Sequence, residues 1–393
     1  MSKLEQLIEE LCPNGVAYDK LDSVLDYEQP AKYIVKDTNY DNSFKTPVLT
    51  AGQSFILGYT SEVNGIYIAT KENPTIIFDD FTTSFHWVDF SFKIKSSAMK
   101  MLRVKPKKIK DVSFRYVYHF MKSIKYEPVD HSRQWIAKYS TFLLPVPPLS
   151  VQEEIVRILD NFTELTAELT AELTARKKQF EYYRDSVFES NILANTTFSP
   201  LSAIADVRDG THDSPKPATE GKFLITSKNV KNGTINFENA YLISLQDFNS
   251  INQRSKVDLW DLLFTMIGTV GEIGLIENEP DFAIKNVGLI KTGDEIISRF
   301  LKYYLTTSKV KKYVENNRSK GSQVFLALGK LRNLPIPVLE KATMEHIVDI
   351  LDRFDTLCND ISKGLPAEIE ARQKQYEYYR DKLLTFKNID AEE

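Results

Sequence analysis

Apolar residues recur at three- and four-residue steps over a long stretch in the middle of the chain, the spacing of one face of an α-helix. The stripe begins at Ile155 and continues to Leu173. Prolines between positions 145 and 148 end a preceding strand, and Ser150 is the predicted N-cap of the helix. The helix is expected to continue to about Phe188, a rod of roughly 55 Å at about 1.5 Å per residue. Because such a rod needs a partner along its length, the pattern predicts a second long helix.

The chain carries an internal repeat, and the second helix is part of it. LPVPPLSVQEEIVRILDNF at 144–162 returns as LPIPVLEKATMEHIVDILDRF at 334–354. ARKKQFEYYRDSVF at 175–188 returns as ARQKQYEYYRDKLLTF at 371–386. A period of about 190 residues is too long for a solenoid. It indicates the tandem duplication of a whole module, a globular part followed by a helix.

The two helical copies are predicted to pair as an antiparallel coiled-coil spine with two-fold pseudosymmetry. The symmetry is imperfect, because Gly364 and Pro366 must break the second copy, with Pro366 restarting the helix in its first turn. In the first copy, the TAEL sequence of 166–169 is repeated at 170–173. One such unit advances a helix by about 6 Å and turns it by about 400°, so an added unit rotates the far end by only ~40°. The repeat is interpreted as a device that sets the distance between two heads; the alternative is helix-favouring low complexity on an exposed surface.

The regions between the helices have the pattern of mixed α+β domains, because short apolar runs alternate with turn residues and each region closes with a basic helix. The predicted domains are a globular region over 1–144 with an N-terminal helix, a helical segment over 145–190, a second globular region over 191–334 and a second helical segment over 335–393. Strands are predicted at 47–50, 65–69, 75–78, 223–226 and 261–268, a turn at 231–233, and the closing helices at 113–126 and 298–316.

The net charge of −4 hides a segregation of charge along the chain. Residues 93–125 hold eleven Lys or Arg against the single acid Asp111, and residues 299–332 hold nine against Glu315. Residues 152–172, which lie between these blocks, carry six acids. Two basic blocks in matching places predict two anion-facing surfaces. For either block alone, the alternative is a solvated face.

Polar side chains that flank the predicted strands suit contact with a DNA duplex. Lys, Ser and Thr anchor phosphates, whereas Asn, Gln, Arg and His reach base edges in the major groove. For any single residue the alternative is a turn or a hydrogen-bonded loop, and the set is more persuasive than its members. The predicted contacts in the first globular region are Lys45, Thr50, Gln53, Thr82, Thr83, Ser84, His86, Lys95, Ser96, Ser97 and Lys100. Those in the second are Thr211, His212, Lys216, Ser227, Lys228, Asn229, Arg254, Thr265, Thr269, Lys285, Asn286, Ser322 and Gln323.

The sequence contains no convincing active site. The glycine-rich stretch from Gly268 to Gly274 lacks the spacing of a phosphate loop and is predicted to be a tight turn. The five histidines are scattered, and Cys12 and Cys358 have no metal-ligand partner at short spacing, so no metal site and no disulfide framework are predicted. No apolar run approaches the ~20 residues of a membrane span. The acidic, amphipathic N-terminus is not a signal peptide, so a cytoplasmic protein is expected.

Taken together, these features resemble the specificity subunit of type I restriction-modification systems over nearly the whole chain. The resemblance is carried by the paired LPxP…IxxILDxF and EYYRD helices, the TAEL tandem and the run DGTHDSPKP…FLITSKN…RSKV…LLFTMIGTVG…FAIKNVGL. It implies that each globular region is a target recognition domain reading one half of a bipartite, asymmetric DNA site, and that the number of TAEL units sets the spacer. Lys228, Asn229, Lys285 and Asn286 are then expected to govern one half-site only.

The resemblance also implies partner proteins. Two modification subunits would methylate adenine with S-adenosylmethionine, and restriction subunits with motor and nuclease activity would need ATP and magnesium. These cofactors belong to the partners, and this chain is expected to bind none and to catalyse nothing. The predicted docking residues on the helices are Ile155, Leu159, Phe162, Tyr182, Tyr183, Ile347, Leu351, Phe354, Tyr378 and Tyr379.

Two other classes of function remain open from the sequence. The first is a helical scaffold that binds only proteins, which a weak dependence of affinity on salt would indicate, since phosphate contacts weaken steeply with salt. The second is a fused nuclease, suggested faintly by Asp281 and Lys285. Magnesium-dependent nicking of DNA by the purified chain would support it.

Overall fold

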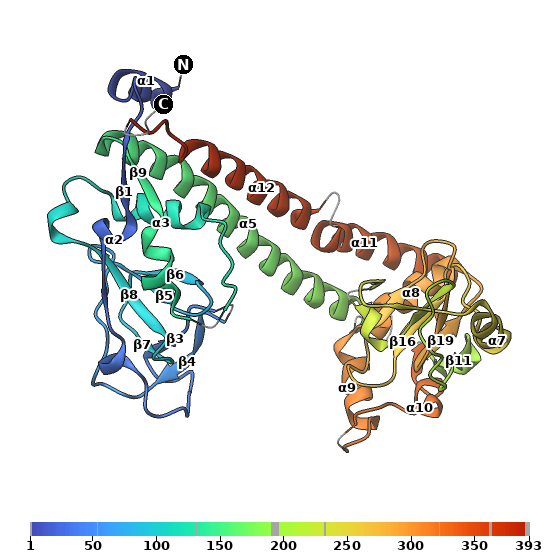
Figure 1. Ribbon diagram of the computed structural model, residues 1–393. Helices are drawn as coiled ribbons and strands as arrows, with labels where there is room; N and C mark the ends of the chain where they lie inside the picture. The colour runs from blue at the N-terminus through green and yellow to red at the C-terminus, as the bar shows by residue number, and fades with distance from the viewer. Residues whose placement is uncertain are drawn as a thin grey trace. The chain divides into compact units, whose positions relative to one another are not determined.

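The structure is a computed structural model that describes residues 2–52, 54–130, 132–189, 196–231, 233–321, 323–360 and 364–389 (Figure 1). The chain forms two compact units. Unit 1 consists of Met1–Glu168 and Glu370–Glu393, and unit 2 of Leu169–Ile369. Helices α5 (Leu149–Glu189) and α12 (Leu365–Leu383) each contribute residues to both units.

Two sheets form the globular part of unit 1 (Figure 1). The first has the order β2-β8-β5-β6 with antiparallel neighbours, and the second has the order β4-β3-β7, in which β3 and β7 are parallel. A further antiparallel pair, β1-β9, lies next to the helical segment in sequence. The strand bounds are β1 Ala17–Lys20, β2 Leu25–Glu28, β3 Thr46–Leu49, β4 Ile56–Thr60, β5 Thr75–Asp79, β6 Phe85–Val88, β7 Lys93–Ile94, β8 Met99–Val104 and β9 Leu143–Val146.

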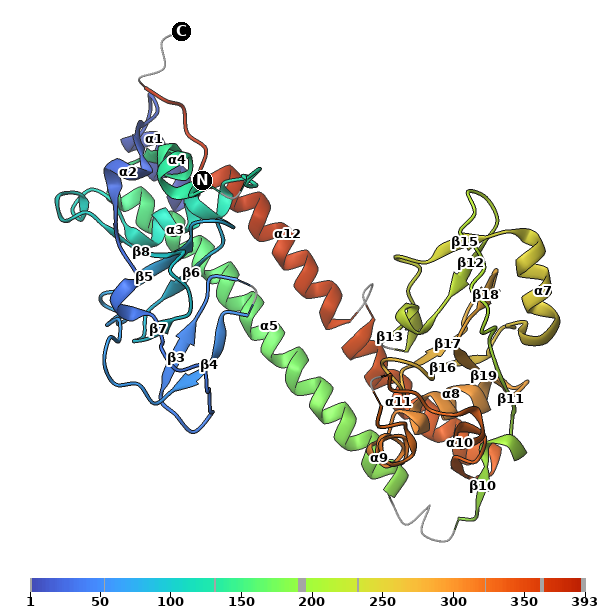
Figure 2. The same ribbon diagram turned by 60° about the horizontal axis from the view of Figure 1, so that its bottom comes forward.

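Unit 2 repeats this plan. Its sheets have the orders β11-β19-β16-β17 and β15-β12-β18, with β12 and β18 parallel, and a pair β10-β20 corresponds to β1-β9 (Figure 2). A hairpin, β13-β14, is added at the predicted turn of 231–233. The strand bounds are β10 Phe198–Pro200, β11 Asp206–Asp209, β12 Lys222–Ile225, β13 Val230–Lys231, β14 Thr234–Ile235, β15 Tyr241–Ile243, β16 Leu262–Thr265, β17 Ile273–Leu275, β18 Phe282–Ile284, β19 Val287–Lys291 and β20 Pro335–Pro337.

The central strand of each unit is buried on both faces, because alternate side chains of a strand point to opposite sides. In β5, Ile76 and Phe78 pack into the core beneath the helices, whereas Ile77 packs between the sheets. In β16, Phe264 and Leu263 divide between two cores in the same way. The predicted tandem α+β modules are therefore confirmed at the level of topology and core.

The helices of unit 1 pack on one side of its larger sheet. In α3 the residues from Tyr116 to Met121 are all buried, and the Tyr116 hydroxyl donates to the Pro145 carbonyl at 3.1 Å. In unit 2 the Tyr304 hydroxyl of α8 donates to the Pro335 carbonyl at 2.8 Å. The remaining helix bounds are α1 Lys3–Leu11, α2 Leu21–Val24, α3 Phe114–Ser123, α4 Gln134–Ala137, α7 Leu245–Ser255, α8 Glu295–Leu305, α9 Ser308–Asn317, α10 Leu328–Arg332 and α11 Lys341–Asn359.

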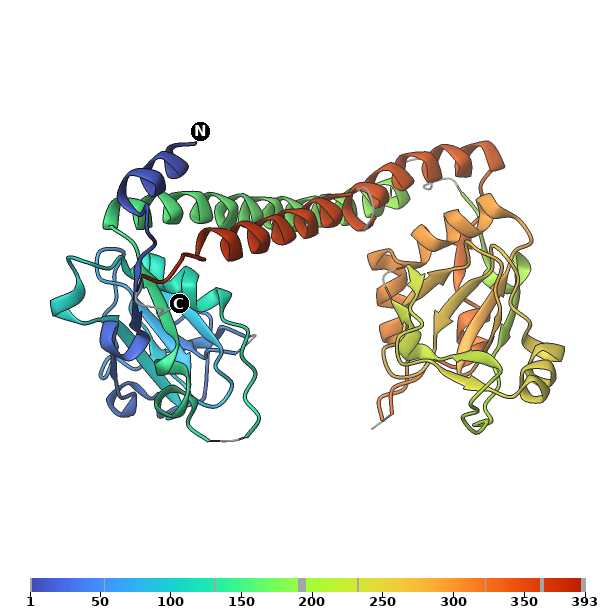
Figure 3. The same ribbon diagram turned by 45° about the horizontal axis from the view of Figure 1, so that its top comes forward.

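Long helices pair within each unit, as the sequence predicts. In unit 1 the ring of Phe162 on α5 stacks on that of Tyr379 on α12, with 5.4 Å between ring centroids. In unit 2 the ring of Tyr183 on α5 lies 5.6 Å from that of Phe354 on α11. The C-terminal segment returns to unit 1, where the Val16 amide donates to the Lys387 carbonyl at 2.8 Å (Figure 3). No helix within the described residues is long and apolar enough to cross a bilayer.

Several predicted bounds are wrong in detail. Helix α5 begins at Leu149, so Ser150 lies inside the helix and is not its N-cap. Residues 65–69 form no regular strand, and only Tyr67 makes a bridge, to Phe92. The closing helix predicted at 298–316 is two helices, because the chain turns after α8 and the Thr307 side chain caps α9 by accepting from the Val310 amide.

The second helical copy consists of two helices. Helix α11 ends at Asn359, and α12 begins at Leu365 with Pro366 in its first turn. A Cβ atom on Gly364 would lie 2.5 Å from the Thr356 carbonyl oxygen, so the close approach of the two backbones requires glycine there.

Candidate nucleic-acid interface

Loops of unit 2 meet around a pocket of about 970 Å³. They are the turn at Thr226–Asn229, the loop at Ile267–Thr269 and the loop at Lys285–Asn286. The other lining residues are Leu224, Lys231, Glu238, Asn239 and Tyr241. The pocket therefore gathers residues from Leu224 to Asn286, which are far apart in the sequence, and most of its polar side chains are among the predicted contacts.

Hydrogen bonds tie these loops into one surface. The Lys285 amide donates to the Ile225 carbonyl at 2.9 Å, and the Asn286 amide donates to the Thr211 carbonyl at 3.1 Å. The Ser227 hydroxyl donates to the Asn286 carbonyl at 3.3 Å. Asn286 has a φ of +56°, in the left-handed region that asparagine tolerates better than most residues. The loops that carry these predicted contacts are thus held in register with one another.

Basic side chains lie on and beside this surface. Lys216 and Lys228 are exposed, and Lys285 is half-buried with its Nζ donating to the Ser214 hydroxyl. Lys231, which the sequence analysis missed, is exposed and also lines the pocket. Ammonium groups at the rim of a pocket suit phosphate oxygens, whose contacts supply most of the affinity for DNA.

His212 contacts a neighbouring side chain through each of its two ring nitrogens. The His212 ring is 62% exposed, and its Nε2 lies 2.9 Å from Oδ2 of the buried Asp209. Its Nδ1 lies 2.9 Å from Oδ1 of Asn286. Arg254 on α7 forms an ion pair with the same Asp209 carboxylate. The geometry presents a fixed imidazole and a fixed carboxamide, the side chains that read base edges, next to phosphate-binding lysines.

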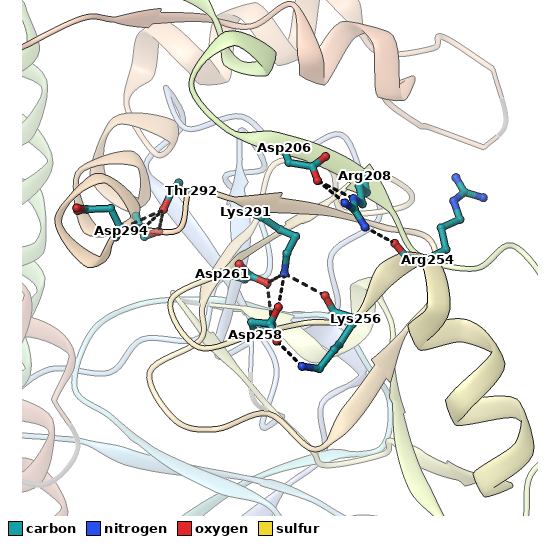
Figure 4. A network of polar contacts seen from close by, with 10 residues as sticks. Asp206, Arg208, Arg254, Lys256, Asp258, Asp261, Lys291, Thr292 and Asp294 are labelled. Atoms are coloured by element: carbon teal, nitrogen blue, oxygen red, sulfur yellow. Dashed lines mark hydrogen bonds and ion pairs between the residues drawn. The ribbon is translucent and has the colours of Figure 1, made fainter.

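A network at the edge of the adjacent sheet explains why Arg254 reaches Asp209. Lys291 bonds Asp258 at 2.9 Å, and Arg208 donates to the backbone carbonyl of Arg254 at 2.9 Å (Figure 4). Burial raises the pKa of the neighbouring Asp261 carboxyl above its usual range. These contacts fasten the end of α7 to β11 and β19, and in Figure 4 the Arg254 side chain points away from the Lys291 cluster.

The loop after β16 is the tight turn that the sequence predicts. The Thr265 hydroxyl donates to the Thr269 carbonyl at 2.5 Å and accepts from the Glu272 amide at 2.8 Å. The Gly268 amide donates to the Val324 carbonyl at 3.0 Å, so the exposed Thr269 and Gln323 lie on adjoining segments. Ser322 and Gln53, both predicted contacts, lie outside the described residues.

Four predicted contacts are corrected by the structure, because their side chains are buried and bonded internally. Thr265 is fully buried in the turn just described. Asn229 is 3% exposed, and its Oδ1 accepts from the Thr226 amide while its Nδ2 donates to the Asn236 carbonyl. Lys100 is 1% exposed and forms an ion pair with Asp80 at 2.9 Å. Thr83 is 9% exposed and donates to the Thr82 carbonyl.

Unit 1 presents comparable residues at the corresponding edge of its sheets. His86 Nε2 lies 3.1 Å from the Gly52 carbonyl, and the His86 ring lies 4.6 Å from that of Phe55, so the loop after β3 is joined to strand β6, which carries His86. The Lys95 amide donates to the Leu49 carbonyl at 3.1 Å, which brings the exposed Lys95 to the same edge. The other predicted contacts that remain exposed or half-buried here are Lys45, Thr50, Thr82, Ser84, Ser96 and Ser97.

Part of each basic block is paired with acids of the protein itself, which reduces the charge left for the two predicted anion-facing surfaces. In the first block, Lys93 bonds Glu62 at 2.9 Å, Lys108 bonds Asp19 at 2.6 Å and Arg115 bonds Asp160 at 2.8 Å. In the second block, Arg299 and Lys302 bond acids of α11 at 2.9 and 2.7 Å. Many of these cations neutralise internal carboxylates, so a count along the sequence overstates the charge offered to DNA.

The predicted docking residues divide into two groups. Ile155, Leu159, Ile347 and Leu351 are at most 3% exposed inside the cores, which corrects their assignment to an external interface. The others are accessible to a partner, with Tyr182 69% and Tyr378 62% exposed. Tyr183 is exposed, and Phe162, Phe354 and Tyr379 are half-buried.

Sequence reasoning missed Asp209, Asn239 and Tyr241. Asp209 stands in the DGTH run, where an acid three residues before a histidine is a signal for a bonded pair. Asn239 and Tyr241 had no comparable signal, because their position follows from the hairpin that precedes them. Among the described residues, no group of three or more His, Cys, Asp or Glu side chains could hold a metal ion.

Solved structures share the fold of this chain. A type I restriction-modification S subunit from M. genitalium matches with a TM-score of 0.53 and 15% sequence identity, over 95% of this chain and 97% of that one. A chain from a structure on complex assembly and conformational transition of the type I restriction-modification system matches with a TM-score of 0.55 and 15% identity, over 95% and 98%. The fold is that of the S subunits of such systems.

Sequence comparison gives the family. The model of the type I restriction modification DNA specificity domain matches twice, at residues 13–179 and 180–371. The specificity subunit of the Escherichia coli type I restriction enzymes EcoR124I and EcoR124II is 37% identical over 98% of this chain and 97% of its own length. A putative type I specificity subunit of Haemophilus influenzae is 29% identical over 98% of both chains. The chain therefore belongs to the type I restriction-modification DNA specificity family, as the sequence resemblance predicts.

Proposed function

We propose that each unit of this chain reads one half of a bipartite, asymmetric DNA site, and that its helices dock methyltransferase and restriction subunits. The observation that supports the DNA-reading role most directly is the pocket of unit 2, where Lys228, Lys285 and Asn286 lie on loops tied to one another. The duplicated sheet order supports the same role for the edge of unit 1 that carries His86 of β6 and Lys95, which follows β7.

In this proposal the chemistry belongs to the partners. Two modification subunits carry S-adenosylmethionine and restriction subunits use ATP and magnesium, while this chain supplies recognition and works in the cytoplasm. The exposed Tyr182 and Tyr378 are proposed contacts of the partners, because exposed aromatic side chains on matching helices are typical of interface anchors.

The half-site assignment is tested by mapping methylation on DNA libraries with the assembled methyltransferase. Changing Lys285 and Asn286 together to alanine is expected to relax or abolish selection at one half-site, and changing His86 and Lys95 to alanine should affect only the other. Each variant serves as the control for its counterpart. Equal loss at both half-sites would contradict modular recognition, and binding that is insensitive to salt between about 50 and 200 mM would contradict DNA contact.

The spacer proposal rests on the TAEL tandem in α5. Every residue from 161 to 179 is at least partly exposed, so a four-residue change there need not rebuild a core. Deleting Thr170–Leu173 is expected to shorten the preferred spacer by one to two base pairs. Four helical residues span about 6 Å, and two base pairs of DNA span about twice 3.4 Å along the duplex axis. Selection from libraries with random spacer lengths measures this. An unchanged spacer preference would rule out a length-setting role for the tandem.

A further inference from the structure

The second basic block divides at the corner between α8 and α9. Before the corner, Arg299 and Lys302 of α8 bond acids of α11, so these two cations are neutralised inside unit 2. After the corner the lysines are exposed, and none of them forms an ion pair with a residue that the structure describes. We call this set the basic strip: Lys309, Lys311 and Lys312 of α9, Lys320 in the segment that follows α9, and Lys330 of α10.

The fold holds the basic strip beside the candidate nucleic-acid interface. The Tyr313 hydroxyl of α9 donates to the Lys330 carbonyl at 2.9 Å, which joins α9 to α10. The Gly268 amide donates to the Val324 carbonyl at 3.0 Å, so the segment after α9 lies against a loop that lines the pocket of unit 2. The lysines of the strip are not themselves among the lining residues in the part of the chain that the structure describes. The basic strip therefore adjoins the pocket but lies outside it.

The corresponding segment of unit 1 does not carry this charge. Between α8 and β20, residues 306–334 hold seven Lys or Arg against the single acid Glu315. Between α3 and β9, residues 124–142 hold three Lys or Arg against two acids, and Lys125 lies 3.5 Å from Asp381. The segment that closes the globular part is thus strongly basic in unit 2 and close to neutral in unit 1.

We propose that the basic strip binds the phosphate backbone of DNA beyond the base pairs that unit 2 reads. Ammonium groups are compact charges that bind phosphate oxygens, and phosphate contacts position a protein without specifying a sequence. The positive charge of the strip and its position next to the pocket loops both favour DNA as the occupant. Each phosphate contact releases condensed counterions, so the strip makes binding by unit 2 more sensitive to salt. This inference rests on the proposed function of unit 2 as the reader of one half-site.

The first test measures DNA affinity against salt for the chain assembled with its methyltransferase subunits. The double variant is Lys312→Gln with Lys320→Gln. The control is Lys256→Gln with Lys341→Gln, because these lysines of unit 2 are also exposed but pair with neighbouring acids. Between about 50 and 200 mM salt, the affinity of wild type and of the control should fall about tenfold more than that of the double variant, since two phosphate contacts contribute about 1.8 to the salt slope. Base selection should be the same in all three.

Duplex length shows where the strip binds. The half-site that unit 2 reads is identified first, with the variant of Lys285 and Asn286 described above. Removing the base pairs outside that half-site should lower the affinity of wild type to that of Lys312→Gln with Lys320→Gln and should leave the double variant unchanged. Removing the base pairs outside the other half-site should affect both proteins equally.

Several outcomes would overturn the inference. A wild-type salt slope in the double variant would show that the strip makes no phosphate contact, and a wild-type affinity that survives truncation would show that it does not reach flanking DNA. Altered base selection in the double variant would mean that the strip reads bases. Weakened assembly with the methyltransferase subunits would assign the strip to an acidic protein surface. A wild-type complex without any sequence selection would instead refute the proposed function itself.

Discussion

In each unit, two side chains of a helix in the globular domain bond one aspartate of a long helix. The first of the two is arginine in both units, and the second differs between the units. In unit 1, Arg115 and His119 of α3 both bond Asp160 of α5, each at 2.8 Å. In unit 2, Arg299 and Tyr303 of α8 bond Asp352 of α11. The spacing of four residues places each pair on one face of its helix. The duplication has thus kept the arginine–carboxylate contact and changed the second donor from imidazole to phenol.

The units differ more in where their lysines point. In unit 1, Lys93 and Lys100 are buried against acids, so part of the basic block stabilises the fold. In unit 2, Lys228 and Lys231 are exposed at the rim of the pocket. The comparison teaches that lysines of the two units can serve different purposes, and that burial distinguishes those that stabilise the fold from those that face the solvent. The following predictions test this difference, beginning with the largest effect.

Replacing the buried Lys100 by methionine is expected to destabilise unit 1 by about 3–5 kcal/mol, because the Asp80 carboxylate would be left buried without its cation. Both side chains of this pair are 2% exposed. The matched variant in unit 2 is Lys291→Met, whose ammonium group bonds two acids but is 21% exposed, and a loss of about 1–2 kcal/mol is expected there. Denaturant unfolding followed by probes in each unit measures both values. Equal losses would contradict the view that burial distinguishes the two lysines.

Changing Asp160 or Asp352 to asparagine removes the carboxylate that pairs with Arg115 or Arg299. Each change is expected to lower the free energy of unfolding of its unit by about 1 kcal/mol. The value is modest because the two carboxylates are 37% and 31% exposed, so solvent screens their charge. Burial pushes the pKa of Asp160 up, but the bond from His119 and the charge of Arg115 outweigh it and hold the pKa below its usual range. Double-mutant cycles with Arg115→Met and Arg299→Met should give similar coupling energies. A coupling confined to one unit would show that the anchors are not equivalent.

His119 of unit 1 and Tyr303 of unit 2 occupy corresponding positions, so we expect a small dependence of stability on pH in unit 1 alone. Burial lowers the pKa of His119, although Asp160 acts in the opposite direction. Below the ordinary histidine value of 6.5, the unfolded chain takes up a proton that the folded unit resists, so the stability of unit 1 falls as the pH is lowered. Burial raises the pKa of Tyr303, which therefore stays neutral throughout this range.

Hydrogen exchange measured at pH 7 and pH 5 checks the last prediction. Amides of α3 should exchange faster at the lower pH by comparison with those of α8, after correction for intrinsic rates. His119→Gln should abolish the difference, since it removes the titrating group. Acceleration of the same size in both helices would indicate general acid destabilisation and would contradict a role for His119.

The repeated helices and the tandem modules could be predicted from the sequence because helical periodicity and self-similarity are local signals. The strands at 75–78 and 223–226 were predicted within a residue at either end, whereas 65–69 was not, since Tyr67 alone pairs and only across a long loop. The split between α8 and α9 depends on a threonine cap that resembles any other Thr in sequence.

The candidate site was predicted as a set of loops but not as an arrangement. Residue type suggested Lys285 and Asn286, and the structure brings them to a common pocket. Residue type also suggested Lys100 and Asn229, which the fold buries. The difference arises from tertiary partners such as Asp80 and Asn236, whose proximity no spacing along the chain reveals.

Unit 1 is closed by hydrogen bonds between its first strand region and the last residues of the chain. Val16 donates to the Lys387 carbonyl and accepts from the Ile389 amide, and the Tyr18 hydroxyl donates to the Phe386 carbonyl at 2.7 Å. During synthesis on the ribosome, the nascent chain of unit 2 is therefore complete before unit 1 can close. The segment that emerges first waits longest for its partners, so premature termination in the part of α12 after Ile369 leaves the first domain unsealed while the second has all of its residues.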